Sequence, residues 1–205
     1  MSKKADFIAI ARHRIQTDGE GVTTLCGFYG CPLRCKYCLN PQSFSDNTKR
    51  ISLSPAELFD RVWIDDLYFV ATNGGVTFGG GEPLMHPEFL TEFKSLCGDK
   101  WHLSVETSLN VHESAVKLAA EAIDFFIVDI KDMNPDIYQK YTSVSNERVI
   151  KNLALLISLV PSERVLIRVP LIYEYNTERD REKSVKFLRE MGFTRFDLFE
   201  YKIKR

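Results

Sequence analysis

Six short β-rich apolar runs alternate with longer helical stretches, and this alternation constrains the fold more than any other feature of the sequence. The predicted strands cover residues 22–28, 75–78, 102–106, 125–130, 164–169 and 195–201. The predicted helices cover residues 55–70, 87–97, 113–122, 146–159 and 178–191. Strands that alternate with helices form parallel βαβ units with right-handed crossovers. The sequence therefore predicts an α/β fold, either an open doubly wound sheet or a partial barrel.

The chain is short enough to form one domain, which we predict to span residues 1–205. Its net charge of -1 predicts no strong attraction to nucleic acid or to an anionic membrane. No stretch approaches the roughly 20 apolar residues that cross a bilayer, and we recognise no signal peptide. The five cysteines are odd in number and four of them are clustered, unlike a disulfide framework. We therefore predict a cytoplasmic protein with a metal at the cluster.

Polar residues follow four of the predicted strands. The cysteines come after the first strand, and a glycine run with Glu82 comes after the second. Glu106 ends the third strand and Asp129 lies near the end of the fourth. In parallel α/β folds, functional residues gather at the carboxyl ends of the strands. The pattern thus predicts one shared site.

The segment CPLRCKYC brings Cys31, Cys35 and Cys38 together, with Cys26 a few residues earlier. Three interpretations are open: buried apolar residues, a structural zinc site with Cys26 as fourth ligand, or an iron–sulfur cluster. Zinc sites usually combine two separated ligand pairs, and this sequence has no distant pair. Compact cysteine loops are typical of iron–sulfur clusters. If three cysteines held a four-iron cluster, one iron would stay open to another molecule.

The glycine run offers a place for such a molecule. Gly79, Gly80 and Gly81 permit positive φ angles and close approach of a ligand to the backbone. Glu82 adds an anionic acceptor that suits an ammonium group. A glycine run alone is weak evidence, but next to the cysteine loop it indicates a cofactor site.

Together, the two motifs resemble the radical S-adenosylmethionine (SAM) superfamily. CPLRCKYC matches its CxxxCxΦC signature, and Gly79–Glu82 resembles its glycine-rich SAM-binding motif. Over residues 18–201 the sequence is similar to the activating enzymes of glycyl radical enzymes, such as pyruvate formate-lyase activating enzyme. The segments that carry this similarity are DGEG at 18–21, CLNP at 38–41, ETS at 106–108, DIK at 129–131 and YTSVSN at 141–146. Family members carry proline at the third position of the first segment and histidine at the second position of CLNP.

The resemblance implies a partial (β/α)6 barrel and two cofactors. A [4Fe-4S] cluster would be bound by Cys31, Cys35 and Cys38, and SAM would chelate the fourth iron. Tyr37 would lie near the adenine of SAM. The residues implied to hold the methionine amino group are Gly79, Gly80, Gly81 and Glu82, and those implied to contact the methionine or ribose are Asp129 and Lys131.

The resemblance also implies roles for residues around SAM. Glu106, Thr107 and Asp129 match positions that hold a monovalent cation in related enzymes. Asp18 and Arg168 match positions that meet the glycine-bearing peptide, although a solvated turn and a salt bridge explain these two residues equally well. Lys202 stands where relatives place a histidine that stacks on adenine, so its part in this pocket is open.

The implied activity is reductive cleavage of SAM, followed by removal of a glycine Cα hydrogen in a partner glycyl radical enzyme. The implied electron donor is reduced flavodoxin or ferredoxin. Three alternatives remain: a radical SAM enzyme for another peptide or small molecule, an anaerobic ribonucleotide reductase activator, and a non-catalytic zinc or electron-transfer protein. The last requires Cys26 as a ligand.

Overall fold

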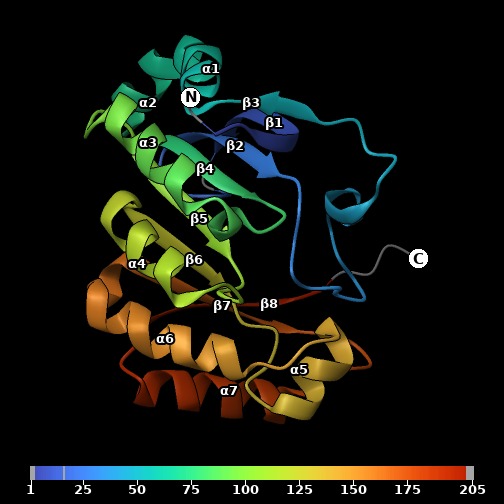
Figure 1. The fold of residues 1–205 in the computed structure, drawn as a ribbon. Helices are drawn as coiled ribbons and strands as arrows, with labels where there is room; N and C mark the ends of the chain where they lie inside the picture. The colour runs from blue at the N-terminus through green and yellow to red at the C-terminus, as the bar shows by residue number, and fades with distance from the viewer. Residues whose placement is uncertain (1–2, 16, 202–205) are drawn as a thin grey trace.

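The computed structural model, which describes residues 3–15 and 17–201, contains one eight-stranded sheet (Figure 1). The order of the strands across it is β3-β1-β2-β4-β5-β6-β7-β8. The strands are β1 (Ala5–Ile15), β2 (Val22–Phe28), β3 (Ile51–Leu53), β4 (Gly75–Gly80), β5 (His102–Thr107), β6 (Phe125–Asp129), β7 (Val165–Leu171) and β8 (Arg195–Glu200). From β2 to β8 every neighbouring pair is parallel. This part of the sheet has the strand order of a partial barrel.

Helices lie along one side of the sheet, and the loop after β2 lies on the other side, near α5 (Figure 1). The α-helices are α1 (Pro55–Val62), α2 (Asp66–Thr72), α3 (Pro87–Cys97), α4 (Glu113–Ala122), α5 (Pro135–Thr142), α6 (Glu147–Leu159) and α7 (Glu178–Glu190). Short 3-10 helices are η1 (Pro41–Phe44), η2 (Trp63–Asp65), η3 (Pro83–Met85) and η4 (Ser162–Arg164). None of the helices in the described part of the chain is long and apolar enough to span a membrane.

The predicted α/β fold is confirmed, and the six predicted strands correspond to β2 and β4–β8. The sequence-based prediction missed β1 and β3, which add an antiparallel edge beside β2. In β1 the alternation of buried and exposed residues holds only near the start, since its second half is largely exposed. That loss of period-2 pattern explains why the strand was not recognised.

The helix prediction needs two corrections. The segment 55–70 is not one helix, because η2 separates α1 from α2. α5 was not predicted, although Asn134 caps it by accepting hydrogen bonds from two backbone N–H groups, and Pro135 occupies its first position. The start of α1 follows the sequence pattern, with Ser54 and Glu57 forming a reciprocal capping box.

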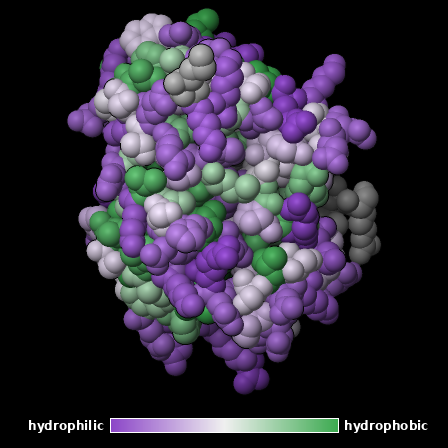
Figure 2. All heavy atoms as spheres, in the orientation of Figure 1, coloured by the Kyte–Doolittle hydropathy of each residue, from purple (hydrophilic) through white to green (hydrophobic). Residues whose placement is uncertain are grey.

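Buried apolar side chains fill the space between the sheet and the helices. On β4, Phe78 is fully buried and meets Phe93 of α3 with ring centroids 5.3 Å apart. Phe28 at the end of β2 packs against Phe7 of β1, with ring centroids 4.5 Å apart. Hydrophilic residues cover most of the face seen in Figure 2. The core thus fixes the strands whose carboxyl ends carry the predicted site.

The turn between β1 and β2 folds toward the strands rather than into solvent. The Thr77 hydroxyl of β4 donates a hydrogen bond to the Asp18 carbonyl at 2.5 Å. A Cβ on Gly19 would lie 3.2 Å from the Ser104 hydroxyl oxygen, so the glycine backbone packs against β5. Asp18 is consequently buried, with 6% of its surface exposed. The interpretation of Asp18 as part of a solvated turn is wrong.

Candidate active site

A cavity of about 560 Å³ lies at the carboxyl ends of the parallel strands. Each of the strands β2 and β4–β8 contributes at least one residue to its wall. The cavity is lined by Arg14, Asp18, Leu25, Cys31, Leu33, Cys35, Cys38, Leu39, Asn40, Gly80, Gly81, Glu82, Glu106, Thr107, Ser108, Asp129, Lys131, Arg168, Asp197, Phe199 and Tyr201. The structure therefore brings the residues of all four predicted strand ends to one place.

The loop that carries the cysteines is held by its backbone against the end of α5. The Arg34 N–H donates to the Thr142 carbonyl at 3.0 Å, and the Lys36 N–H donates to the Tyr141 carbonyl at 3.1 Å. The Arg34 guanidinium donates to the carbonyl of Cys31 at 2.6 Å. The last carbonyls of a helix have no hydrogen-bond partner within the helix. The N–H groups of the loop supply these partners at the end of α5.

Cys31, Cys35 and Cys38 are half-buried and all three line the cavity, whereas Cys26 is fully buried within β2. Burial raises the pKa of Cys31 to about 12, and it raises the pKa of Cys35. These thiols therefore hold their protons until a metal displaces them. Three soft ligands around one cavity fit the donor set of an iron–sulfur cluster. The buried Cys26 does not fit the zinc interpretation.

The glycine run lets the backbone at the end of β4 approach the backbone at the end of β2 more closely than side chains would permit. At Gly80, φ is +84° and a Cβ would lie 2.7 Å from the Gly27 Cα. A Cβ on Gly81 would overlap the Gly30 carbonyl oxygen. Asn40, which follows the cysteine loop, donates to the Gly80 carbonyl at 3.3 Å. The glycines thus dock the cysteine loop on β4 and leave backbone exposed to the cavity. Gly79 does not line the cavity.

Glu82 is buried at the inner wall, and its carboxylate accepts four hydrogen bonds. The donors are the Thr107 hydroxyl at 2.7 Å, the Ser108 hydroxyl at 2.6 Å, the Ser108 N–H at 2.9 Å and the Leu84 N–H at 3.2 Å. Burial raises the pKa of Glu82, while these hydrogen bonds act in the opposite direction. Glu82 therefore joins the loops after β4 and β5, and Thr107 turns its hydroxyl to Glu82.

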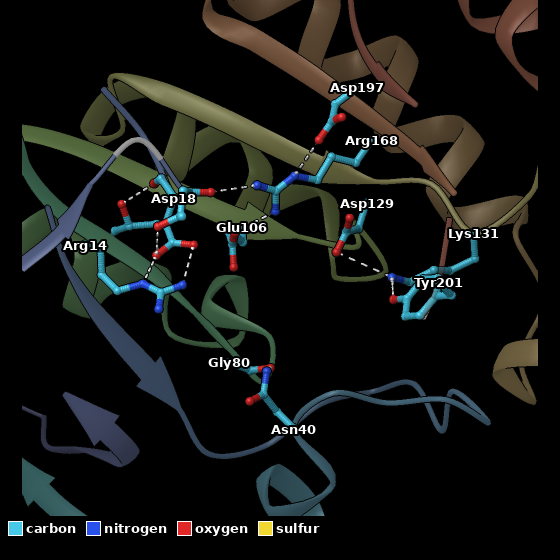
Figure 3. A network of polar contacts seen from close by, with 12 residues as sticks. Arg14, Asp18, Asn40, Gly80, Glu106, Asp129, Lys131, Arg168, Asp197 and Tyr201 are labelled. Carbon is cyan, nitrogen blue, oxygen red and sulfur yellow. Dashed lines mark hydrogen bonds and ion pairs between the residues drawn. The ribbon is translucent and has the colours of Figure 1, made fainter. Parts of the chain in front are cut away.

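Lys131 is a buried cation on the wall that faces the cysteine loop (Figure 3). Its ammonium lies 3.4 Å from a carboxylate oxygen of Asp129 and donates to the Tyr201 hydroxyl at 3.3 Å. Burial is the largest single influence and opposes the charged form, but the acidic groups around the ammonium, Asp129 first among them, together outweigh it and raise the pKa of Lys131 well above its usual value. Lys131 is therefore charged at neutral pH.

Arg168 and Asp18 lie in two linked ion-pair groups across the cavity (Figure 3). Arg168 donates to Glu106 at 2.6 Å and to the Thr17 carbonyl at 3.2 Å, and it lies 3.5 Å from Asp197. Burial raises the pKa of Glu106, and Arg168 opposes this rise. The carboxylate of Asp18 is paired with Arg14 at 2.5 Å. The salt-bridge interpretation of Arg168 is therefore confirmed as a contact, and its guanidinium still lines the cavity.

The predicted cation ligands Glu106, Thr107 and Asp129 line the same cavity, but each already has another partner. Within residues 3–15 and 17–201, no three His, Cys, Asp or Glu side chains are close enough together to hold a single metal ion. The cation site remains a prediction.

Tyr37 does not line the cavity. Its hydroxyl donates to Glu174 at 2.8 Å, and its ring meets Tyr175 with centroids 5.6 Å apart. Its predicted place near the adenine remains untested. The aromatic residues that do line the cavity are Phe199 and Tyr201, and their ring centroids lie 5.6 Å apart. Lys202 lies outside the described residues.

Several residues of the cavity were not predicted as site residues, among them Arg14, Ser108, Asp197 and Tyr201. Ser108 stands within the ETS segment and could have been found from that motif. Arg14 reaches the cavity only because β1 pairs with β2 and the turn folds inward. Asp197 lies within the last predicted strand, where alternation would have placed it on the same face as Phe199.

A family model for the radical SAM superfamily matches residues 26–195. The chain belongs to the radical SAM superfamily. Its cofactors are accordingly SAM and a [4Fe-4S] cluster, in agreement with the prediction, and the half-buried cysteines around the cavity fit the latter.

Curated relatives carry the names of activating enzymes. The chain is 29% identical to the (2S)-3-sulfopropanediol dehydratase activating enzyme of Klebsiella oxytoca, over 85% of this chain and 74% of that protein. It is 30% identical to the pyruvate formate-lyase 2-activating enzyme of Escherichia coli strain K12, over 80% of this chain and 65% of that protein. The predicted resemblance to activating enzymes of glycyl radical enzymes is thereby confirmed.

A solved structure supports the fold. Streptococcus suis SuiB bound to S-adenosylmethionine superposes with a TM-score of 0.65 at 16% sequence identity. The match covers 85% of this chain and 39% of SuiB, so this chain spans about two fifths of that protein. At this level of identity the likeness concerns the fold, and it agrees with the predicted partial barrel.

Proposed function

We propose that this protein is the activating enzyme of a glycyl radical enzyme and removes a Cα hydrogen from a glycine of that partner. The observation that carries the proposal is the meeting of three half-buried cysteines, the Gly80–Gly81 backbone and polar residues of strands β5–β8 at one cavity. The names of the curated relatives supply the substrate class. We further propose that residues 1–205 act as one radical SAM domain.

In the proposed site, Cys31, Cys35 and Cys38 hold the cluster. When bound, the cluster and SAM supply a 5′-deoxyadenosyl radical that takes a hydrogen atom from the substrate. The residues of this chain bind, orient and shield these groups. The Gly80 and Gly81 backbone admits the methionine part of SAM, Glu82 fixes the loop that carries it, and the charged wall at Asp129 and Lys131 holds its polar groups.

The polypeptide substrate would meet the opposite wall. Arg168 and Asp18 present a guanidinium and a carboxylate there, each already oriented by a partner within the protein. Such groups can hydrogen-bond to the backbone of an extended segment and hold a glycine near the cofactor. Contact with the substrate would also displace water, which protects a radical from side reactions.

We also propose that the electron comes from reduced flavodoxin or ferredoxin, and that the protein works in the cytoplasm. The cysteines support a reducing compartment, because every one of the five is free.

The test is an anaerobic activation assay. The protein, reconstituted with iron and sulfide, is incubated with SAM, a reductant and a purified glycyl radical enzyme. We expect the electron paramagnetic resonance (EPR) signal of a glycyl radical in the partner and one 5′-deoxyadenosine per radical. A partner whose glycine is replaced by alanine is the control and gives no signal.

Other outcomes separate the alternatives. Cleavage of SAM without a radical in the partner would overturn the glycine substrate and favour another peptide or small molecule. Failure to cleave SAM despite an intact cluster would overturn the enzymatic proposal. Bound zinc in place of iron would support the non-catalytic alternative.

A further inference from the structure

Lys131 has more hydrogen-bonding capacity than its surroundings in the protein use. A lysine ammonium has three donors. Among the described residues it donates only to the Tyr201 hydroxyl at 3.3 Å, and its distance to Asp129 is 3.4 Å. Only 6% of the residue is exposed, so bulk water does not surround the charge. A buried cation with unused donors thus faces the cavity.

A chain of contacts places this cation beside the cysteine loop. Tyr201, which binds Lys131, lies with its ring 6.4 Å from that of Tyr141. The Tyr141 carbonyl accepts the Lys36 N–H, next to Cys35 in the chain. Lys131 and Cys35 both line the cavity. Lys131 therefore faces the same cavity in which Cys35 would hold an iron.

The sign of the local charge follows from the same geometry. The side chain of Lys131 is 8% exposed and that of Asp129 is 29% exposed, so water screens the carboxylate more than the ammonium. The positive charge of Lys131 is therefore the less screened charge of this pair inside the cavity that Cys35 lines. A positive charge at a cluster stabilises its reduced form, because reduction adds one negative charge.

We propose that the positive charge of Lys131 raises the reduction potential of the cluster and so favours entry of the electron. The negative charge of Asp129 offsets part of this effect. In the step concerned, the cluster gains one electron from the donor protein and no bond forms or breaks. The inference rests on the cluster of the proposed function and is independent of the glycine substrate.

The test is a redox titration of the reconstituted cluster, followed by EPR, without SAM and without a partner protein. We expect Lys131→Met to shift the midpoint potential to more negative values, since it removes the charge and keeps the length of the side chain. Lys131→Arg keeps the charge and should stay near the wild-type midpoint. Asp129→Asn should shift the midpoint in the positive direction.

Lys36→Met is the matched control, because Lys36 is an exposed lysine beside Cys35 on the same loop. Water screens its charge, so its midpoint should stay at the wild-type value. An unchanged or more positive midpoint in Lys131→Met would overturn the inference, and so would an equal shift in Lys36→Met. If Lys131→Met failed to retain the cluster, an unchanged midpoint in Asp129→Asn would overturn it. The titration contains no partner, so its outcome is separate from that of the activation assay.

Discussion

Cys26 differs from the three cysteines of the loop in where its side chain lies. It is fully buried in β2, whereas Cys31, Cys35 and Cys38 are half-buried around the cavity. We expect Cys31→Ala to lose most of its bound iron after reconstitution, because one of three thiolates is missing. Cys26→Ala should keep its iron and lose only some stability, by about 1 kcal/mol or more for the small cavity.

Iron analysis and the visible absorption spectrum after anaerobic reconstitution measure both variants. Loss of iron in Cys26→Ala, with the fold intact by circular dichroism, would contradict the three-cysteine assignment. Retention of a full cluster in Cys31→Ala would do the same.

Gly80 is under a second kind of constraint, imposed by its backbone. Its φ is +84°, and the methyl carbon of an alanine at this position would lie only 2.7 Å from the Gly27 Cα, so Gly80→Ala is both strained and crowded. We expect a loss of about 2–4 kcal/mol in the free energy of unfolding and weaker binding of SAM. Gly98→Ala is the control, because Gly98 also has a positive φ but has no atom within 4 Å of the added carbon.

Denaturant unfolding and calorimetric titration with SAM measure these effects. The Gly98 variant should lose less stability and bind SAM as the wild type does. Equal effects in the two variants would show that crowding at Gly27 is unimportant.

Ser143 is a residue whose backbone conformation favours glycine. It ends α5 with φ +70° and ψ +13°, in the left-handed region that favours glycine. We expect Ser143→Gly to raise the free energy of unfolding by about 0.5–1 kcal/mol. Asn73→Gly is the control, because Asn73 ends α2 at φ +55° and asparagine tolerates this region better. A smaller gain for Ser143 than for Asn73 in thermal unfolding would contradict the argument.

At the scale of the element, the start of α1 illustrates what local sequence determines. Ser54 accepts the Glu57 N–H at 3.2 Å, and Glu57 accepts the Ser54 N–H at 2.7 Å. The hydrogen bond from Lys4 is the largest cause that lowers the pKa of Glu57, to about 2, and the Ser54 N–H adds to it. The two contacts between Ser54 and Glu57 join residues only three positions apart. The helix start was therefore predictable from the local sequence.

The lowered pKa of Glu57 sets the pH dependence of its contribution. A carboxylate whose pKa is lower in the folded state stabilises the fold above its unfolded pKa, and the effect is lost as pH falls toward the folded value. The difference in melting temperature between wild type and Glu57→Gln should be present at pH 7 and shrink as pH falls from about 4.5 toward about 2. Thermal unfolding of the cluster-free proteins measures it, and a difference that grows at low pH would contradict the assignment.

Other elements show where sequence reasoning stops. α5 carries a clear N-cap and an early proline, but its residues were assigned only to a family motif. The break at η2 lies where Asp65 and Asp66 interrupt two short apolar runs, and buried Asp65 there bonds Arg12 and Thr24 on neighbouring strands. Those partners lie more than forty positions earlier in the chain, so no local pattern contains them.

At the scale of the whole molecule, the order of the parallel strands follows from the alternation of strands and helices. The site followed in part, because strand ends of one sheet meet at one edge. The pairings of side chains within the site could not be predicted from the sequence. Arg14 with Asp18, Arg168 with Glu106 and Lys131 with Tyr201 depend on side-chain directions that are set only when the strands and the turn are packed.

The assembled molecule should be brown and sensitive to oxygen. We expect about four iron atoms per chain after anaerobic reconstitution, the content of one [4Fe-4S] cluster. The cluster should be sensitive to oxygen because the three cysteines leave one of its irons without a protein ligand. Elemental analysis and absorption before and after exposure to air measure this. About one zinc per chain, or a colour that is stable in air, would contradict it.

The tie between the cysteine loop and α5 has a consequence for biosynthesis. The carbonyls that hold the loop belong to Tyr141 and Thr142, which the ribosome adds more than a hundred residues after Cys31. A nascent chain that ends before them already has its three thiols, but nothing yet fixes the backbone between them. Iron delivered to the growing chain would meet flexible thiols rather than a shaped site. Loading of the cluster should therefore follow translation of α5.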